Sequence, residues 1–181
     1  MDRPPRQSDT SEMDISPDRI SPLLVELADP RSSEAAELIR RLTDELTARY
    51  DFLDDGAGNF RAEDALVAGA AFLIGRAEGQ AAACAALRPM TPGVGEIKRV
   101  FVDPRHRGRG YGRALLAELE RIARELGYHT LRLETGTRQP ESIRLYESSG
   151  YRRIPNFEPY VESHWSVCYE KTLDGRDDAT V

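Results

Sequence analysis

Residues 105–112 read RHRGRGYG, a run in which three glycines alternate with larger side chains among arginines. The apolar segment RVFVDP (99–104) precedes this run, and YGRALLAELERIARELGY (111–128) contains leucine and isoleucine at a spacing that predicts an amphipathic helix. A strand, a glycine-rich turn and a helix in this order indicate an anion site. The first N–H groups of a helix have no partner within the helix and carry partial positive charge. Glycines let anionic oxygens approach the main chain.

The charge of this turn contrasts with that of the whole chain. The 181 residues carry a net charge of -6, whereas six basic residues stand against two acidic ones between Glu96 and Arg113. An acidic chain argues against a nucleic-acid binder. The longest apolar stretch, ALVAGAAFLIG (65–75), is too short to span a bilayer, and the first residues lack the apolar core of a secretory signal. A cytoplasmic protein without membrane or nucleic-acid partners is therefore expected.

The chain length and the hydrophobic pattern predict one domain over residues 21–173. Residues 1–20 and 174–181 are read as a disordered N-terminal tail and a frayed C-terminal tail. The apolar stripe of the helix after the turn is expected to contain Leu115, Leu119, Ile122 and Leu126. Other helices are predicted at 32–50 and 140–150, and strands at 21–30, on both sides of AEGQ (77–80), at 95–104, 129–136, 151–154 and 164–173. Successive strands before the turn predict an antiparallel meander.

The glycine turn has alternative interpretations as a nucleotide site. A P-loop is excluded because the run lacks Gly-Lys-Ser/Thr. A dinucleotide site gains support from Glu134, which follows the glycines by the interval expected for a ribose-binding acid. The spacing G-x-G-x-G and the preceding meander, in place of a parallel βαβ series, make the dinucleotide the weaker hypothesis.

The residues from Arg107 to Gly112 resemble the Q/R-x-x-G-x-G/A signature of the GNAT superfamily of N-acetyltransferases. A second segment, ESIRLYESSGY (141–151), is similar to the N-x-x-A-x-x-L-Y-x-x-x-G-F segment of that family. The resemblance runs from about residue 65 to 154. It implies an α+β fold, in which helices flank a central, twisted and mostly antiparallel sheet of about seven strands.

The resemblance also implies acetyl-CoA as cosubstrate and assigns residues to it. The backbone of the turn would hold the pyrophosphate, the strand before it would pair with the pantetheine arm, and the N–H of Val102 would polarise the thioester carbonyl. Gln139 stands where the family carries asparagine, and an amide there can contact the cofactor. The implied cofactor residues are Val100, Phe101, Val102, Arg107, Gly108, Arg109, Gly110, Tyr111, Gly112, Arg113 and Gln139.

The chemistry at the amine needs a base and an acid. An alkylammonium has a pKa of about 10.4 and has to lose a proton before it attacks. Glu96, in the segment GEI, is the candidate base, although a strand residue paired with a neighbouring arginine is an equally good interpretation. Tyr146 is the candidate that protonates the departing thiolate, by resemblance to the family. The three His and two Cys residues show no metal-ligand spacing, so direct attack in a ternary complex is expected.

The acceptor is predicted to be a small-molecule amine. The loop 156–167 and the segment 50–55 are candidate pocket walls, because acidic and aromatic side chains would suit a cationic acceptor. The side chains concerned are Asp51, Asp54, Asp55, Glu158, Tyr160, Glu162, His164 and Trp165. Two alternatives remain: a protein N-terminal or lysine acetyltransferase, and a non-catalytic acyl-CoA-binding sensor. A homodimer is compatible with this kind of protein.

Overall fold

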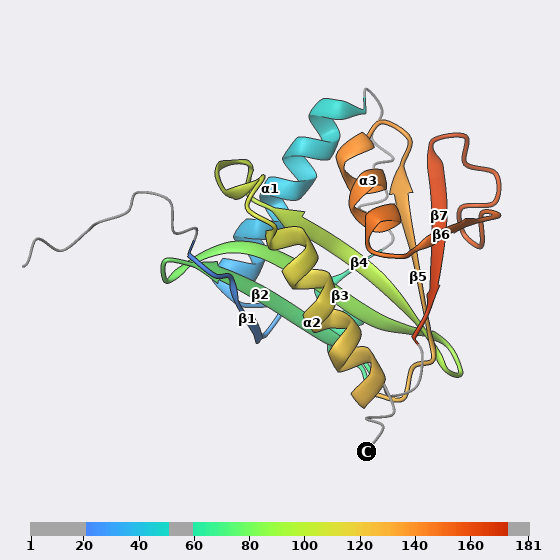
Figure 1. Cartoon of the computed structure of the whole chain (residues 1–181), viewed down its shortest axis with the longest axis horizontal. Helices are drawn as coiled ribbons and strands as arrows, with labels where there is room; N and C mark the ends of the chain where they lie inside the picture. Colours follow the sequence, from blue (N-terminus) through green and yellow to red (C-terminus); the bar gives the residue numbers. More distant parts are fainter. Residues whose placement is uncertain (1–20, 51–59, 174–181) are drawn as a thin grey trace, which may run out of the picture.

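A seven-stranded sheet forms the centre of the molecule (Figure 1). The computed structural model describes residues 21–50 and 60–173. The strands are β1 (Leu24–Leu27), β2 (Ala71–Ala77), β3 (Gln80–Thr91), β4 (Val94–Val102), β5 (Thr130–Gly136), β6 (Arg152–Ile154) and β7 (Ser166–Thr172). The helices are α1 (Ser33–Arg49), α2 (Tyr111–Glu125) and α3 (Pro140–Ser148), with short 3₁₀ turns η2 (Ala62–Ala65) and η3 (Pro104–His106).

The strand order is β1-β2-β3-β4-β5-β7-β6, and β4 and β5 are the parallel neighbours in an otherwise antiparallel sheet. The predicted α+β class, the strand count and the antiparallel meander through β2, β3 and β4 are thus confirmed. The predicted tails, 1–20 and 174–181, lie outside the described residues.

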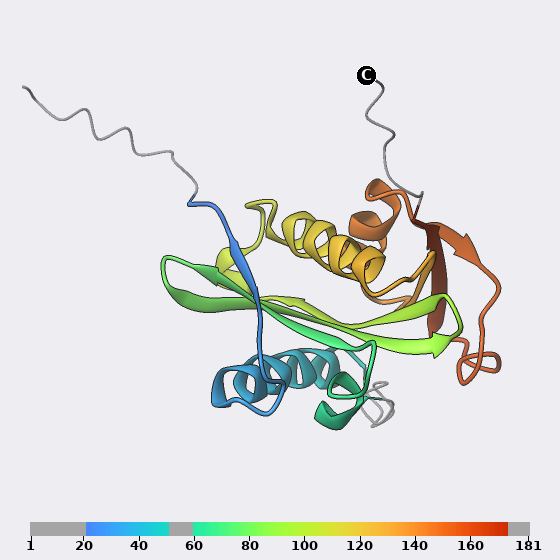
Figure 2. The same ribbon diagram turned by 90° about the horizontal axis from the view of Figure 1, so that it is seen from below.

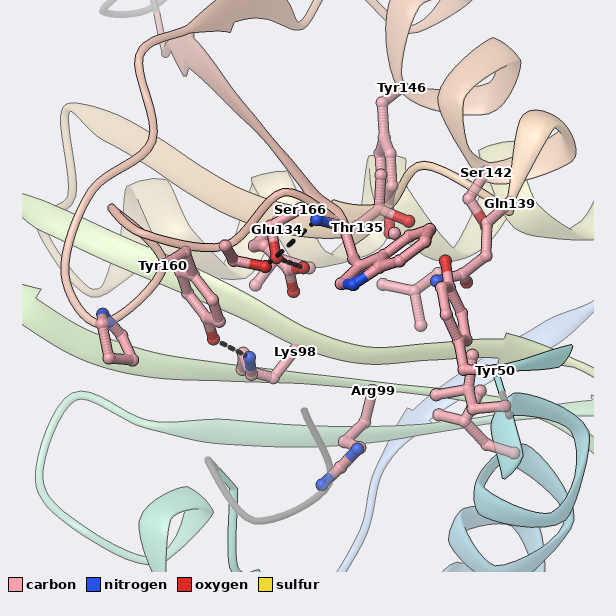
Figure 3. A pocket seen from close by; sticks show the side chains of 18 residues that line it. Tyr50, Lys98, Arg99, Glu134, Thr135, Gln139, Ser142, Tyr146, Tyr160 and Ser166 are labelled. Carbon is pink, nitrogen blue, oxygen red and sulfur yellow. Dashed lines mark hydrogen bonds between the residues drawn. The ribbon is translucent and has the colours of Figure 1, made fainter. Parts of the chain in front are cut away.

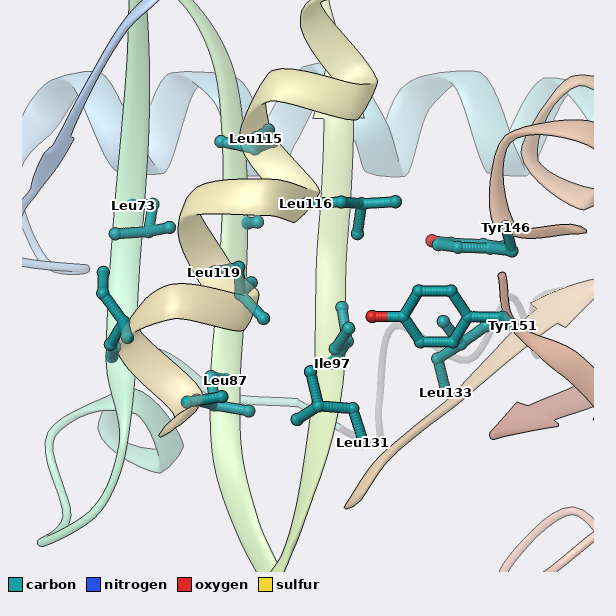
Figure 4. Close-up of a cluster of buried hydrophobic side chains, with 14 of the residues drawn as sticks. Leu73, Leu87, Ile97, Leu115, Leu116, Leu119, Leu131, Leu133, Tyr146 and Tyr151 are labelled. Atoms are coloured by element: carbon teal, nitrogen blue, oxygen red, sulfur yellow. The ribbon is translucent and has the colours of Figure 1, made fainter. Parts of the chain in front are cut away.

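Helices cover both faces of the sheet in three layers (Figure 2). The helix α1 packs on one face with η2, where Leu38 and Leu42 meet Phe72 and Phe101. On the other face lie α2 and α3, and Leu115, Leu116 and Leu119 of α2 fill the space above β2, β3 and β4 (Figure 4). The two cores hold the sheet rigidly from both sides.

Three of the four residues predicted for the apolar stripe of α2 are buried. Leu115 and Leu119 are 0% exposed and Ile122 is 6% exposed, whereas Leu126 is 42% exposed. The difference arises because Leu126 caps the helix, just before Gly127 reverses the chain with a φ of 85°. The periodicity predicted the helix face but not the place where the face leaves the core.

The main irregularity of the sheet is a β-bulge in β4. Between the pairs Cys84↔Phe101 and Ala86↔Lys98, two residues of β4 stand opposite one residue of β3. Arg99, at this bulge, has a φ of 55°, in the left-handed region that side chains other than glycine rarely occupy. Pairing between β4 and β5 ends immediately before it, at Ile97↔Leu133. The strands then diverge, as Figure 1 shows.

Truncation in the α2 core tests the importance of this layer. We expect Leu119→Ala to lower the free energy of unfolding by about 2–5 kcal/mol, because the substitution leaves a cavity in a fully buried site. The matched Leu126→Ala, at the exposed end of the same helix, should cost about 0.5 kcal/mol or less. Urea unfolding followed by circular dichroism measures both. Equal losses in the two variants would contradict the packing described here.

Candidate functional site

The site lies where β4 and β5 separate. The bulge places Ile97 and Val100 against the α2 core, and it directs Lys98 and Phe101 to the opposite face of the sheet. The glycine turn, the N-terminus of α2 and the start of α3 surround the gap between the strands. The gap therefore exposes main chain that a regular sheet would have paired.

The glycine turn has the backbone that its sequence predicts. Gly108 and Gly110 have φ values of 77° and 78°, and a Cβ at either position would meet no heavy atom within 4 Å. Their requirement is therefore conformational, and it also leaves the main chain open to a ligand. Gly112 serves a different purpose, since a Cβ there would lie 3.0 Å from a methyl carbon of Leu145 in α3. Its absence lets α3 approach α2.

A buried aspartate organises the entry into the turn. The carboxylate of Asp103, 3% exposed, accepts hydrogen bonds from the main-chain N–H of Arg105 at 3.0 Å and from Arg41 of α1 at 2.6 Å. The side chain of Arg105 binds it as well, at 2.9 Å. These hydrogen bonds to arginine hold the pKa of Asp103 well below its usual range. The carboxylate thus fixes η3, which leads into the glycines, and ties it to α1.

A groove of about 360 Å³ extends from β4 over the glycine turn to α3. All but one of the predicted cofactor residues line it, and Arg109 is the exception, with an exposed side chain. The first printed bond of α2 runs from the N–H of Ala114 to the C=O of Gly110. The N–H groups of residues 111–113 therefore have no acceptor within the helix and point toward this groove. The groove can hold an anion at its glycine end.

Two predicted contacts to the cofactor depend on details of β4. The N–H of Asp103 donates to Ala82 of β3, so alternation along the strand directs the N–H of Val102 away from β3. This orientation suits the predicted carbonyl contact. The guanidinium of Arg107 instead binds Glu45 of α1 at 2.6 Å and the C=O of Val102 at 2.9 Å. Arg107 therefore joins α1 to β4, besides lending its main chain to the turn.

A second cavity, of about 190 Å³, adjoins the groove and is called here the acceptor pocket (Figure 3). It shares Leu42, Val100, Gln139 and Ser142 with the groove, so a molecule in one cavity can reach a molecule in the other. Residues lining only the acceptor pocket include Tyr50, Ile97, Lys98, Glu134, Tyr146, Tyr160, Trp165 and Ser166.

Tyr146 projects from α3 into the wall of the acceptor pocket (Figure 3). It is 6% exposed and packs edge-on against Tyr151, with ring centroids 5.8 Å apart. Burial raises the pKa of its phenol far above the usual value, and the nearby charge of Glu134 adds to the effect. The phenol therefore stays protonated at neutral pH, in the state that can donate a proton.

Glu96 lies on the face of the sheet opposite α2, and it lines a different cavity together with Asp64 and Arg88. Its Oε2 accepts hydrogen bonds from Arg88 at 2.8 Å, and its Oε1 lies 3.7 Å from Nζ of Lys98. This arrangement has the arginine partner of the alternative interpretation. Between Glu96 and the acceptor pocket stands Lys98, which the sequence analysis did not consider.

Two charged residues of the acceptor pocket were missed. Lys98 is 8% exposed and donates a hydrogen bond to the hydroxyl of Tyr160 at 2.6 Å, while Glu134 accepts one from Ser166 Oγ, also at 2.6 Å. The available signal for Glu134 was alternation in β5, where Leu131 and Leu133 face the α2 core and Glu134 faces the other side. No comparable signal places Lys98, because the bulge changes the alternation of β4.

The loop 156–167 supplies aromatic side chains to the acceptor pocket, as expected, but not its acids. Tyr160 and Trp165 line the pocket, whereas Glu158, Glu162 and His164 are exposed and do not. The reason is that main-chain bonds accepted by Asn156 Nδ2 donors fold the loop inward at Tyr160 and Ser166. The other predicted wall, Asp51, Asp54 and Asp55, lies outside the described residues.

Trp165 takes part in a stacked arrangement at the mouth of the acceptor pocket. The guanidinium of Arg138 lies 4.8 Å from the ring centroid of Trp165 and 5.7 Å from that of Tyr50. The hydroxyl of Tyr50 also accepts a hydrogen bond from the N–H of Arg138 at 3.1 Å. Together these contacts join the end of α1 to the loops that follow β5 and precede β7.

Residues 21–50 and 60–173 contain no cluster of His, Cys, Asp or Glu that could hold a metal ion. In the same part of the chain no helix is long and apolar enough to cross a membrane. The two cysteines are buried thiols, as expected, and burial raises the pKa of Cys84 to about 12.

Comparison with known proteins identifies the class to which this site belongs. Residues 35–151 match the family described as Acetyltransferase (GNAT) family. The chain is 41% identical over 103 residues to an IAA acetyltransferase of Azospirillum brasilense, covering 56% of this chain and 67% of that protein. It is 37% identical over 93 residues to an uncharacterized N-acetyltransferase of Schizosaccharomyces pombe, covering 50% of this chain and 55% of the relative. The chain therefore belongs to the GNAT family of acetyltransferases, and it is an acyltransferase enzyme.

Solved structures agree with the fold. A Klebsiella pneumoniae protein assigned as an acyl-CoA N-acyltransferase is similar with a TM-score of 0.70 and 35% identity, over 84% of this chain and 98% of that one. A Salmonella typhimurium protein assigned as an acetyltransferase, whose structure holds its cofactor acetyl-CoA, is similar with a TM-score of 0.63 and 22% identity. This second match covers 86% of this chain and 96% of the other, and it supports the fold alone.

Glycine substitutions at the two ends of α2 separate backbone strain from ligand binding. We expect Gly110→Ala and Gly127→Ala each to lower stability by about 1–2 kcal/mol, because both glycines have left-handed φ and open surroundings. Only the Cβ at Gly110 enters the groove, so only Gly110→Ala should weaken acetyl-CoA binding, by about tenfold or more in calorimetry. Equal binding by the two variants would contradict a cofactor role for the turn.

Proposed function

We propose that this acyltransferase transfers the acetyl group of acetyl-CoA to the amine of a small molecule, by direct attack in a ternary complex. The observation that carries the proposal is the junction between the groove and the acceptor pocket. Val100, Gln139 and Ser142 line both cavities, so a thioester in the groove and an amine in the pocket would meet at this point. Direct attack then needs no covalent enzyme intermediate.

The groove would bind acetyl-CoA through its two ends. The unpaired N–H groups at the start of α2 suit the pyrophosphate, and the separation of β4 from β5 leaves strand edges for the amides of pantetheine. The N–H of Val102, directed away from β3, would polarise the thioester carbonyl and stabilise the oxyanion formed on attack. Gln139 begins α3 at the junction, where its amide can contact the cofactor.

Tyr146 would donate the proton that the leaving thiolate takes up. Its side chain lies on the wall of the acceptor pocket, and its raised pKa keeps the proton available. The proton of the acceptor amine also needs a base. Glu96 stays the prediction for that role from the sequence, and it would have to act across Lys98, which separates it from the pocket.

The size of the acceptor pocket supports a small acceptor. Its volume of about 190 Å³ is below the 300–1,000 Å³ typical of sites for drug-sized ligands. Tyr50, Tyr160 and Trp165 supply aromatic walls, and Glu134 supplies a carboxylate that can attract an ammonium group. A peptide substrate would need an extended groove on the acceptor side.

Replacement of Tyr146 tests the enzyme and its proposed acid together. With acetyl-CoA and a panel of small amines, amino acids and peptides, we expect thiol release with at least one small amine. Tyr146→Phe should lower kcat by about 10–100-fold, at the lower end of general acid catalysis because a thiolate is a tolerable leaving group. Its affinity for acetyl-CoA should change little.

Tyr128→Phe is the matched control, since the hydroxyl of Tyr128 binds the C=O of Gly69 at 2.7 Å and contacts neither cavity. Its kcat should equal that of the wild type. Acetyl-CoA binding without turnover of any amine would refute acetyl transfer to small molecules. Turnover of peptides alone would move the function to protein acetylation.

A further inference from the structure

We propose that the amino group of Lys98 is the base that takes the proton of the acceptor amine, with Glu96 and Tyr160 as its positioning residues. This inference rests on the proposed acetyl transfer. It differs from the sequence prediction because the group in contact with the acceptor is an amine on the pocket wall, and the carboxylate acts from behind it.

The position of Lys98 is the first support. Its side chain is 7% exposed, yet it lines the acceptor pocket, and Figure 3 shows it beside Tyr160 on the wall that faces Glu134. Nζ donates a hydrogen bond to the hydroxyl of Tyr160 at 2.6 Å. The loop holds Tyr160 through its own main chain, which accepts from Asn156 and donates to the C=O of Phe157. Nζ is thus fixed at the pocket surface.

The second support is a carboxylate oxygen without a hydrogen-bond donor. Glu96 Oε1 is buried, has no hydrogen-bond partner, and lies 3.7 Å from Nζ. Arg88 binds the other oxygen, Oε2, and Arg88 is in turn bound by Asp64 at 3.1 Å. The carboxylate therefore cannot rotate freely, and its empty acceptor site points at Lys98. A small approach would satisfy it when Nζ carries a third proton.

The charges around Lys98 allow both of its protonation states. Burial lowers the pKa of Lys98, which favours the neutral amine that a base requires. The carboxylates of Glu96 and Glu134 raise it, and so stabilise the product ammonium. The titratable or charged groups that face Nζ from β3, β4, β5, β7 and the loop are Arg88, Glu96, Arg99, Glu134, Cys168 and Tyr160.

The proton balance is simple. The ammonium of the acceptor loses one N–H proton to the lone pair of neutral Lys98, which becomes an ammonium beside Glu96 Oε1. The neutral acceptor attacks the thioester, the C–S bond breaks, and the thiolate takes a proton from Tyr146. After the products leave, Lys98 returns its proton to water in the pocket.

The experiment compares Lys98→Arg, Lys98→Met and Glu96→Gln with the wild type. Arginine keeps the charge but cannot accept a proton, and methionine removes the amine at similar length. We expect both Lys98 variants to lose about 100-fold or more in kcat/KM for the amine, while acetyl-CoA binding by calorimetry stays within about twofold. Retained binding would show that the variants are folded.

The pH profile distinguishes Lys98 from Glu96. Because the carboxylate of Glu96 raises the pKa of Lys98, its removal in Glu96→Gln should move the acidic limb of kcat/KM to lower pH and leave substantial activity. The pKa of the acceptor is common to both enzymes, so the displacement belongs to the protein. Abolished activity in Glu96→Gln, with Lys98→Arg near the wild-type rate, would overturn the proposal in favour of Glu96.

Lys171→Met is the matched control, since Lys171 is also paired with a glutamate, Glu120 at 2.7 Å, and lines neither cavity. It should change stability without changing the rate or the pH profile. A wild type that turns over no amine would refute the proposed acetyl transfer itself. A wild type that turns over an amine, with unchanged kcat/KM in both Lys98 variants, would refute only the role of Lys98.

Discussion

The site depends on a single constraint, the bulge in β4 at Arg99. A left-handed φ of 55° at a residue with a long side chain costs about 1–3 kcal/mol, which the packing on both faces of the sheet has to supply. Its effect is to end the parallel pairing of β4 and β5 at Ile97↔Leu133 and to separate the strands beyond it. The groove, the acceptor pocket and the junction between them occupy this gap. A regular β4 would continue the ladder and close the site.

The remaining elements keep the gap from closing or opening further. Three arginine–carboxylate contacts connect α1 to the other walls: Arg41 with Asp103, Arg107 with Glu45, and Arg49 with Glu141. They reach the turn, β4 and α3 in that order, so one helix fixes three sides of the groove. The glycine at 112 lets α3 approach α2, which brings Tyr146 over the junction. Stability and function use the same contacts here.

The sequence predicted the parts of the site that are local. The glycine turn, the helix after it and the start of α3 are encoded by adjacent residues, and their backbone follows from φ requirements and helix caps. The pocket walls could not be predicted in this way. Lys98 and Glu134 come from different strands, and their faces depend on a bulge and on a register that no short motif records. The loop before β7 also depends on tertiary contacts, which is why its aromatic residues face the pocket and its acids face solvent.

The charge of the acceptor pocket explains why the reaction needs a proton transfer early. Arg88 and Lys98 balance Glu96 and Glu134 in a region with little water, while Arg99 turns away from the pocket to the C=O of Phe60. An acceptor that enters as an ammonium adds a positive charge to this balanced set, and charges in a poorly solvated site interact strongly. The set returns to balance when one proton leaves. Whichever group releases it to water, the pocket favours the neutral amine, which is the form that attacks the thioester.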